Sequence, residues 1–225
     1  MVLVRNSHKH RDTIYRSTGV LSTGSREFTF PVDSTVESLM VSITLQCLQS
    51  IAVIRPSNTE AGAGEPNVDD NRFKSGAILI VNKPEAGTWK VRIAGIGLFF
   101  VVAQAKSDIA LNRVEFVEPR GRQGHEGYFS VQRPLHMGET HILLVKVDAP
   151  PGETKFRLID SAGETLEPVV MTPVDDNGDK REFSSTFALK HSAFRVAVEG
   201  RDEAGYAYQR VLTRLIQVHP PNVEQ

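Results

Sequence analysis

The sequence has a single cysteine, Cys47, a single tryptophan, and no apolar run near the roughly 20 residues that a membrane-spanning helix needs. A disulfide within the chain is therefore excluded, and stability has to come from the apolar core. Basic and acidic residues balance at 26 against 27, and no segment concentrates Lys and Arg. This balance predicts no nucleic-acid partner, and the hydropathy predicts no membrane insertion.

Secretion signals are also missing. There is no Asn-x-Ser/Thr sequon, and the first ten residues contain no apolar core of signal-peptide length. Taken by themselves, these observations predict a chain that tolerates a reducing compartment. A fragment of a longer secreted protein would look the same.

Long helical patterns are absent as well, and short alternating patterns take their place. The stretch Ile78–Ala103 predicts three strands separated by turns at 82–87 and 94–97. Within it, alternation places Trp89, Val91 and Ile93 on an inner face and Thr88, Lys90 and Arg92 on an outer face. The last strand, 98–103, is nearly all apolar. Trp89 is therefore expected in a core.

The chain before this stretch alternates in the same way. Residues 39–45 place every second side chain inward, and Cys47 continues that register, so we expect Cys47 to be a small buried side chain. Residues 50–56 predict a further strand. Residues 1–20 are polar and basic and are interpreted as a lead-in or the tail of an upstream domain, although 13–15 could add a short strand.

After residue 108, strand signals recur about every ten residues up to residue 218, with Gly, Pro and Asn turns between them. This spacing is typical of an immunoglobulin-like sandwich. The predicted fold class is all-β, with two β-sandwich domains in tandem. The first is galactose-binding-like or jelly-roll-like over 21–107, the second is immunoglobulin-like over 108–220, and 221–225 form a tail.

The candidate ligand site is the long polar segment Ser57–Ser75, which is interpreted as a loop. Its oxygen-bearing side chains could ligate calcium, and its one aromatic ring could stack on a sugar. A solvated turn is the alternative. The candidate residues are Asp69, Asp70, Asn71, Arg72 and Phe73.

Catalytic patterns are weak. The motifs G-x-S-x-G and H-E-x-x-H do not occur, and no enzyme is predicted. A zinc-dependent hydrolase that uses His125, His136 and His141 is an alternative, as is a surface metal at the His8 and His10 pair; structural or solvated histidines are the competing interpretation.

Asp175, Asn177 and Asp179 have the spacing of the first EF-hand ligands. The sixth position is Lys180 instead of glycine and the twelfth is Thr186 instead of glutamate, so a β-turn explains the segment better. No cofactor is predicted, with calcium as the alternative.

Two segments together indicate a family. Residues 81–91, VNKPEAGTWKV, and residues 194–211, FRVAVEGRDEAGYAYQRV, resemble segments of the region that follows the von Willebrand factor A domain in hemicentins and related proteins. The resemblance covers residues 26–218. It implies a galactose-binding-like sandwich followed by an immunoglobulin-like domain. The A-domain metal motif D-x-S-x-S does not occur here, so no metal site is transferred.

The expected function is that of a non-catalytic interaction or adhesion module with a protein or matrix partner. A carbohydrate-binding module is the alternative, with a glycan as the ligand of the 57–75 segment. The resemblance implies an extracellular location if the chain is part of a longer A-domain protein, and a cytoplasmic one otherwise. As this fragment, the chain is expected to be monomeric.

Overall fold

The computed structural model describes residues 11–122, 127–177 and 180–221. The described residues form strands and no helix, so none of them provides a helix that could cross a membrane. The strands are β1 (Arg11–Leu21), β2 (Ser25–Val32), β3 (Ser38–Ile54), β4 (Glu60–Ala61), β5 (Val68–Phe73), β6 (Gly76–Asn82), β7 (Gly87–Lys106), β8 (Ala110–Arg120), β9 (Gly127–Ser130), β10 (Thr140–Asp148), β11 (Thr154–Ile159), β12 (Thr165–Val169), β13 (Thr172–Asn177), β14 (Lys180–Ala188), β15 (Ala193–Arg201), β16 (Ala207–Val211) and β17 (Ile216–Gln217). The predicted all-β sandwich class is confirmed.

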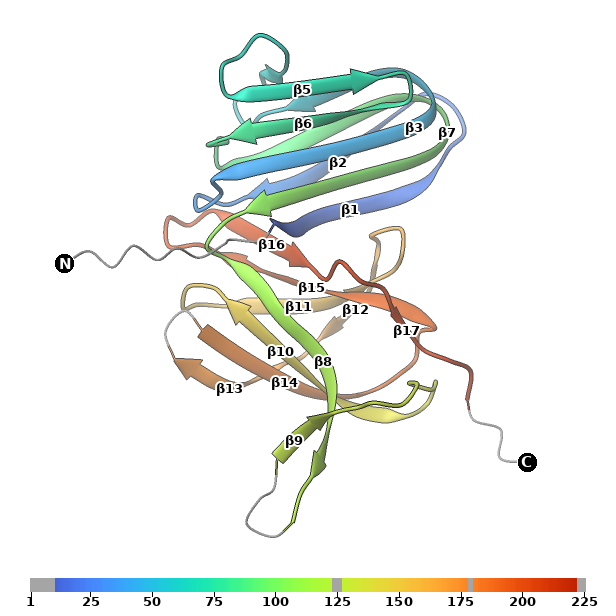
Figure 1. The fold of residues 1–225 in the computed structure, drawn as a ribbon, viewed down its shortest axis with the longest axis vertical. Coiled ribbons are helices and arrows are strands. Elements are labelled where there is room, and N and C mark those ends of the chain that lie inside the picture. Colours follow the sequence, from blue (N-terminus) through green and yellow to red (C-terminus); the bar gives the residue numbers. More distant parts are fainter. Residues whose placement is uncertain (1–10, 123–126, 178–179, 222–225) are drawn as a thin grey trace, which may run out of the picture.

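The first sandwich is built from two long strands, β3 and β7, that bend and contribute to both layers (Figure 1). The first half of β7 pairs with β2, and its second half pairs with β1. The two halves face each other across the core, where the rings of Phe28 on β2 and Phe99 on β7 lie 5.3 Å apart. Trp89 lies fully buried in the same core, as the alternation predicted.

The bend in β7 corrects the prediction of three strands. Residues 94–97 were expected to be a turn, but the strand continues through them and stays paired with β3. Gly95 and Gly97 have φ values of 146° and 107°, which favour glycine. A Cβ atom on Gly95 would lie 2.1 Å from the carbonyl oxygen of Cys47, so glycine also permits the close approach of the two strands.

The bend in β3 corrects the prediction for Cys47. The pairing of β3 with β7 shifts between Leu45 and Cys47 and again between Leu48 and Ser50. Each shift interrupts the alternation of side chains, because an extra residue turns the following ones to the other face. Cys47 is consequently exposed, not buried.

The described part of the expected lead-in is also different. Residues 11–21 form β1, which pairs with β7 along nearly its whole length. Ile14 of this strand is fully buried in the core of the first sandwich. The polar composition of the segment gave no sign of this role. β1 is held in place by β7 and β16, and both are distant from it in the sequence.

The second sandwich places the sheet β13-β14-β10-β8-β9 against strands β12, β11, β15 and β16 (Figure 1). Aromatic side chains join the layers: the rings of Phe156 and Phe183 lie 4.9 Å apart, and Phe116 meets Phe194 edge to face. The strands predicted after residue 108 are present, and β13 is an additional one.

One sheet crosses from the first sandwich to the second. β1 pairs with β16 at Thr13 and Val211, so the order β12-β11-β15-β16-β1-β7-β3-β6-β5 is continuous. β7 ends at Lys106 and β8 begins at Ala110, near the expected boundary at 107/108. The division into two domains stays a prediction, because this shared sheet joins them.

Candidate functional site

The five residues of the candidate ligand site do not lie in a loop. The 57–75 segment contains two strands, β4 and β5, and β5, which carries all five residues, is the last strand of the large sheet. The loop interpretation was wrong because β5 is mostly polar, and its strand conformation comes from pairing with β6.

The alternation of β5 divides the five residues between two faces. Asp69, Asn71 and Phe73 point outward, and the Asn71 side chain donates a hydrogen bond of 2.9 Å to Asp69. The carboxylate of Asp70 is almost fully buried and accepts hydrogen bonds of 3.1 and 3.0 Å from Nε of Arg72. The five side chains therefore do not converge on one point.

The outward residues of β5 belong to a larger surface, which we call the outer face. It comprises Arg16, Thr18 and Val20 of β1, Leu98, Phe100, Val102 and Gln104 of β7, Met40, Ser42 and Thr44 of β3, Ile78 and Ile80 of β6, and Asp69, Asn71 and Phe73 of β5.

Large apolar side chains dominate the outer face. Val20, Phe73, Ile78, Leu98 and Phe100 are between 38% and 69% exposed. Strand pairing places them on one face: Val20 lies opposite Leu98, and Phe100 and Ile78 lie on adjacent rows with β3 between them. An exposed apolar surface of this kind usually marks an interaction site.

Strand β7 shows that only one of the two layers of the first sandwich has this apolar outer surface. Before the bend, the outward residues of β7 are Thr88, Lys90 and Arg92, and Arg92 forms a 2.8 Å ion pair with Glu27 of β2. After the bend they are Leu98 and Phe100. One layer of the first sandwich is thus polar outside, and the other is apolar outside.

The histidines considered for a metal site have other partners. Nδ1 of His136 donates to the carbonyl oxygen of Pro220 at 2.8 Å, and Nε2 of the buried His141 donates to Glu139 at 2.9 Å. His8, His10 and His125 lie outside the described residues, as does Asp179 of the EF-hand-like spacing. Among the residues described, no group of three or more His, Cys, Asp or Glu side chains could hold a metal ion.

The Glu139 carboxylate is held in its ionised form. The hydrogen bond from His141 is the largest cause that lowers its pKa, burial opposes this, and the backbone N–H of His136 and the side chain of Arg133 lower it further, to about 2. The arrangement supports the fold of the second sandwich, because it ties the start of β10 to the loop before it.

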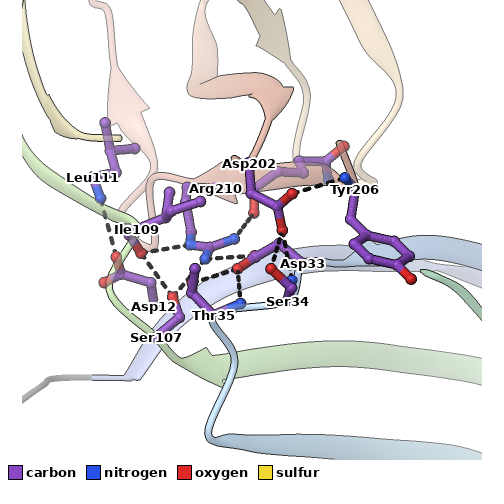
Figure 2. Close-up of polar contacts among 11 residues, drawn as sticks. Asp12, Asp33, Ser34, Thr35, Ser107, Ile109, Leu111, Asp202, Tyr206 and Arg210 are labelled. Atoms are coloured by element: carbon purple, nitrogen blue, oxygen red, sulfur yellow. Dashed lines mark hydrogen bonds and ion pairs between the residues drawn. The ribbon is translucent and has the colours of Figure 1, made fainter. Parts of the chain in front are cut away.

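The junction between the sandwiches is the most buried polar cluster of the described chain (Figure 2). Arg210 of β16 is fully buried and forms a 2.8 Å ion pair with the fully buried carboxylate of Asp33. The same guanidinium donates to Ser107 Oγ at 2.5 Å and to the carbonyl oxygen of Ile109 at 2.9 Å. One side chain thus contacts the end of β2, the β7–β8 link and the start of the second sandwich.

Asp202 forms a second connection beside it (Figure 2). Its Oδ2 accepts 2.7 Å hydrogen bonds from the backbone N–H and the hydroxyl of Ser34. Burial would raise the pKa of Asp202, but the bonds from Ser34 and from the backbone N–H groups of Tyr206 and Ala204 outweigh burial and lower it. Nε2 of Gln209 donates to the Ile14 carbonyl at 2.7 Å. These contacts fix the sandwiches to each other.

The two-layer fold of the first sandwich, with its bent β3 and β7, agrees with a comparison of sequence families. Residues 16–108 match the hemicentin galactose-binding domain-like family. This hemicentin-like domain covers the sheet from within β1 to the β7–β8 link, and the second sandwich lies outside the match. The description names a fold related to sugar-binding domains and does not by itself show a sugar ligand.

Other comparisons add little. No curated protein matches the chain. The chain is 14% identical to a solved structure of the Bacillus licheniformis lipase BlEst2 in propeptide form, with a TM-score of 0.42, over 91% of this chain and 41% of that one. A likeness of this size supports no inference about activity. The matching family is named for a binding domain.

Two clefts lie where the hemicentin-like domain meets the second sandwich. One, of about 570 Å³, is lined from both sides and includes Thr88, Lys155 and Glu199; the other, of about 450 Å³, includes Ser34 and Lys180. No histidine or cysteine of the described chain lines either cleft. The outer face is taken as the candidate binding surface because of its exposed apolar side chains.

Sequence reasoning missed the outer face. The run 98–103 was described only as nearly all apolar, a composition that does not distinguish a covered face from an exposed one. The available signal was the contrast within β7 between Thr88, Lys90 and Arg92 before the glycines and Leu98 and Phe100 after them. That contrast has meaning only once both halves are known to belong to one strand.

Proposed function

We propose that this chain is a non-catalytic interaction module that binds a protein partner through the outer face of its hemicentin-like domain. The observation that carries the proposal is the set of exposed side chains Val20, Leu98 and Phe100 on a sheet whose other layer is polar outside. Burying such side chains against a partner is favourable by about 25 cal/mol per Å² of apolar area.

The second sandwich fits the role of a rigid support. In chain order, β8, β10, β11, β13, β14, β15 and β16 can be named A to G. They then lie as D-E-B-A in one sheet and C-F-G in the other, with β9 added beside A and β12 added beside C; D-E-B-A and C-F-G are the two sheets of an immunoglobulin constant-type domain. This order supports an immunoglobulin-like assignment, and the junction at Arg210 would hold this domain in a fixed orientation.

The family match supports an extracellular setting for the proposed module. We further propose that it lies next to an A domain in a longer protein, as the resemblance of residues 81–91 and 194–211 implies. Matrix proteins are accordingly the partners to examine first. Sequencing of the adjoining coding region would test this setting, and the absence of an upstream A domain there would count against it.

Binding can be tested with substitutions that keep strand propensity. Leu98→Thr with Phe100→Thr removes apolar area from the outer face, and Val170→Thr is the matched control, because Val170 is 87% exposed on the second sandwich. We expect the chain to bind a component of an immobilised matrix-protein panel, and the double variant to lose at least tenfold in affinity. Equal binding by all three proteins would refute a role for the outer face.

Carbohydrate binding is a second candidate, favoured by one local feature. Phe73 is 46% exposed at the edge of the outer face, beside the polar side chains of Asn71 and Asp69. Gly76 leaves room for the ring, since a Cβ there would lie 2.9 Å from it. A glycan array with and without calcium, repeated with Phe73→Ala, tests this. The absence of binding in both conditions would eliminate it.

A further inference from the structure

We propose that the outer face binds a second copy of this chain, so that two hemicentin-like domains pack face to face about a two-fold axis that runs along the strands. The inference rests on the proposed function, because it names the partner of the same surface. It departs from the monomer that the sequence predicts, since the sequence does not reveal this surface.

The size of the apolar centre suits a folded partner. Fully exposed aromatic and aliphatic side chains offer on the order of 150–200 Å² each, so the exposed parts of Val20, Phe73, Ile78, Leu98 and Phe100 amount to about 450 Å². Roughly 60% of an interface is apolar, so an interface with this apolar centre would bury a total of about 750 Å² on each partner. Stable protein interfaces bury about 800 Å² per partner.

The shape of the surface suits a sheet as its partner. The outer face is carried by five neighbouring strands in the order β1-β7-β3-β6-β5. At about 4.8 Å per strand, the face is about 19 Å wide from β1 to β5. Sheets stack face to face at about 10 Å, with side chains of both faces interdigitating. A second outer face provides such a surface.

The charges on the outer face favour a copy in one orientation. Its central strands carry Ser42, Thr44 and Gln104 among the apolar residues, and none of these is charged. The charged members are Arg16, on β1, and Asp69, on β5, on opposite sides of the face; the next outward residue of β7, Lys106, is paired with Glu37. A two-fold axis along the strands exchanges the two edges, and so brings Arg16 of one copy toward Asp69 of the other.

The environment of Arg16 agrees with this arrangement. Its buried Nε has no hydrogen-bond partner among the described residues. Arg195 of the second sandwich lies near it; burial together with the charge of Arg16 lowers the pKa of Arg195, and the charge of Asp160 opposes this in part. A carboxylate that arrives from another copy would offset this repulsion between two cations.

The oligomeric state of the complete chain tests the inference. In sedimentation equilibrium up to about 0.2 mM chain, we expect a monomer–dimer equilibrium, with at least tenfold weaker dimerisation for Leu98→Thr with Phe100→Thr and no change for Val170→Thr. Circular dichroism of each variant verifies folding. A monomer at all concentrations, or a dimer that the double variant leaves intact, would overturn the inference.

Charge exchange tests the orientation. Asp69→Arg and Arg16→Glu should each weaken dimerisation, and the two together should restore it. If the double exchange is no better than the single ones, the proposed axis is wrong. Should the chain be monomeric while the Leu98 and Phe100 substitutions still abolish binding to a matrix protein, the proposed function stands and only the second copy is excluded.

Discussion

The buried ion pair between Asp33 and Arg210 offers the sharpest test of how the two sandwiches are joined. Both side chains are fully buried, and the two are 177 residues apart in the sequence. Replacing Asp33 by alanine leaves the Arg210 guanidinium in the interior with hydrogen bonds but without a counter-charge. A buried charge in this state is far more costly than a lost surface contact.

The magnitude follows from the contacts. Breaking a buried pair by removing one partner costs about 3–5 kcal/mol. Asp33→Ala also removes the 2.6 Å hydrogen bond that Asp33 accepts from the Thr35 hydroxyl. We therefore expect this variant to lose about 5 kcal/mol of unfolding free energy. Asp33→Asn keeps an oxygen that can accept a hydrogen bond, so we expect it to lose less unfolding free energy, about 3 kcal/mol.

Urea unfolding provides the assay. Trp89 is the only tryptophan, so its fluorescence reports on the first sandwich, while far-ultraviolet circular dichroism reports on both. In the unaltered chain, the shared sheet predicts coincident transitions by the two probes. Glu164→Ala is the control. It breaks the exposed 3.4 Å pair with Arg26, and such pairs contribute about 1 kcal/mol or less.

The double replacement Asp33→Leu with Arg210→Met gives a further check. It removes both charges, so it should cost less than Asp33→Ala alone, even though Arg210 has more contacts to lose. Asp33 variants that lose no more stability than Glu164→Ala would show that the pair is not buried as described.

Three further predictions concern single positions. Trp89→Ala should cost about 3–5 kcal/mol through the cavity it leaves, measured by circular dichroism; a change below 1 kcal/mol would mean an exposed ring. Gly163→Ala should destabilise more than Gly205→Ala, because both have φ near 90° but only at Gly163 would a Cβ lie 2.0 Å from the Arg16 carbonyl oxygen; equal unfolding midpoints would contradict this contact. Glu139 has a folded pKa of about 2 against an ordinary 4.5, so its ionised form stabilises the fold above pH 4.5 and this stability is lost as the pH falls toward 2. Glu139→Gln should flatten that part of the stability–pH profile, and an unchanged profile would rule out this carboxylate as its source.

The family match supports a binding module, and the outer face is the surface that we propose for binding. The match ends near residue 108, at the link between β7 and β8. Arg210 donates a hydrogen bond to the backbone of Ile109 just beyond that point. The family match therefore ends at the buried junction, where Arg210 joins the link between β7 and β8 to the second sandwich.

Local pattern alone determined much of the fold. Period-two alternation correctly placed Trp89, Val91 and Ile93 in the core and Lys90 and Arg92 outside. The recurrence of turn residues after residue 108 correctly indicated a second set of short strands. These features depend on neighbours in sequence, so the sequence contains the information that defines them.

Other features depended on contacts between distant segments. Cys47 turned outward because β3 shifts its register against β7, and the outward position of Asp69, Asn71 and Phe73 followed from the pairing of β5 with β6. Leu98 looked like a core residue, because an apolar side chain in a strand does not show whether another layer covers it.

What the sequence determined by itself is therefore the all-β class, the position of the main strands and the buried side of most of them, since these follow from the period of the strand. Only the tertiary structure decided that β7 is one bent strand, that the outer face is uncovered and that Arg210 meets Asp33. The physical reason is that burial and charge pairing depend on which surfaces come together, and strands distant in the chain decide that.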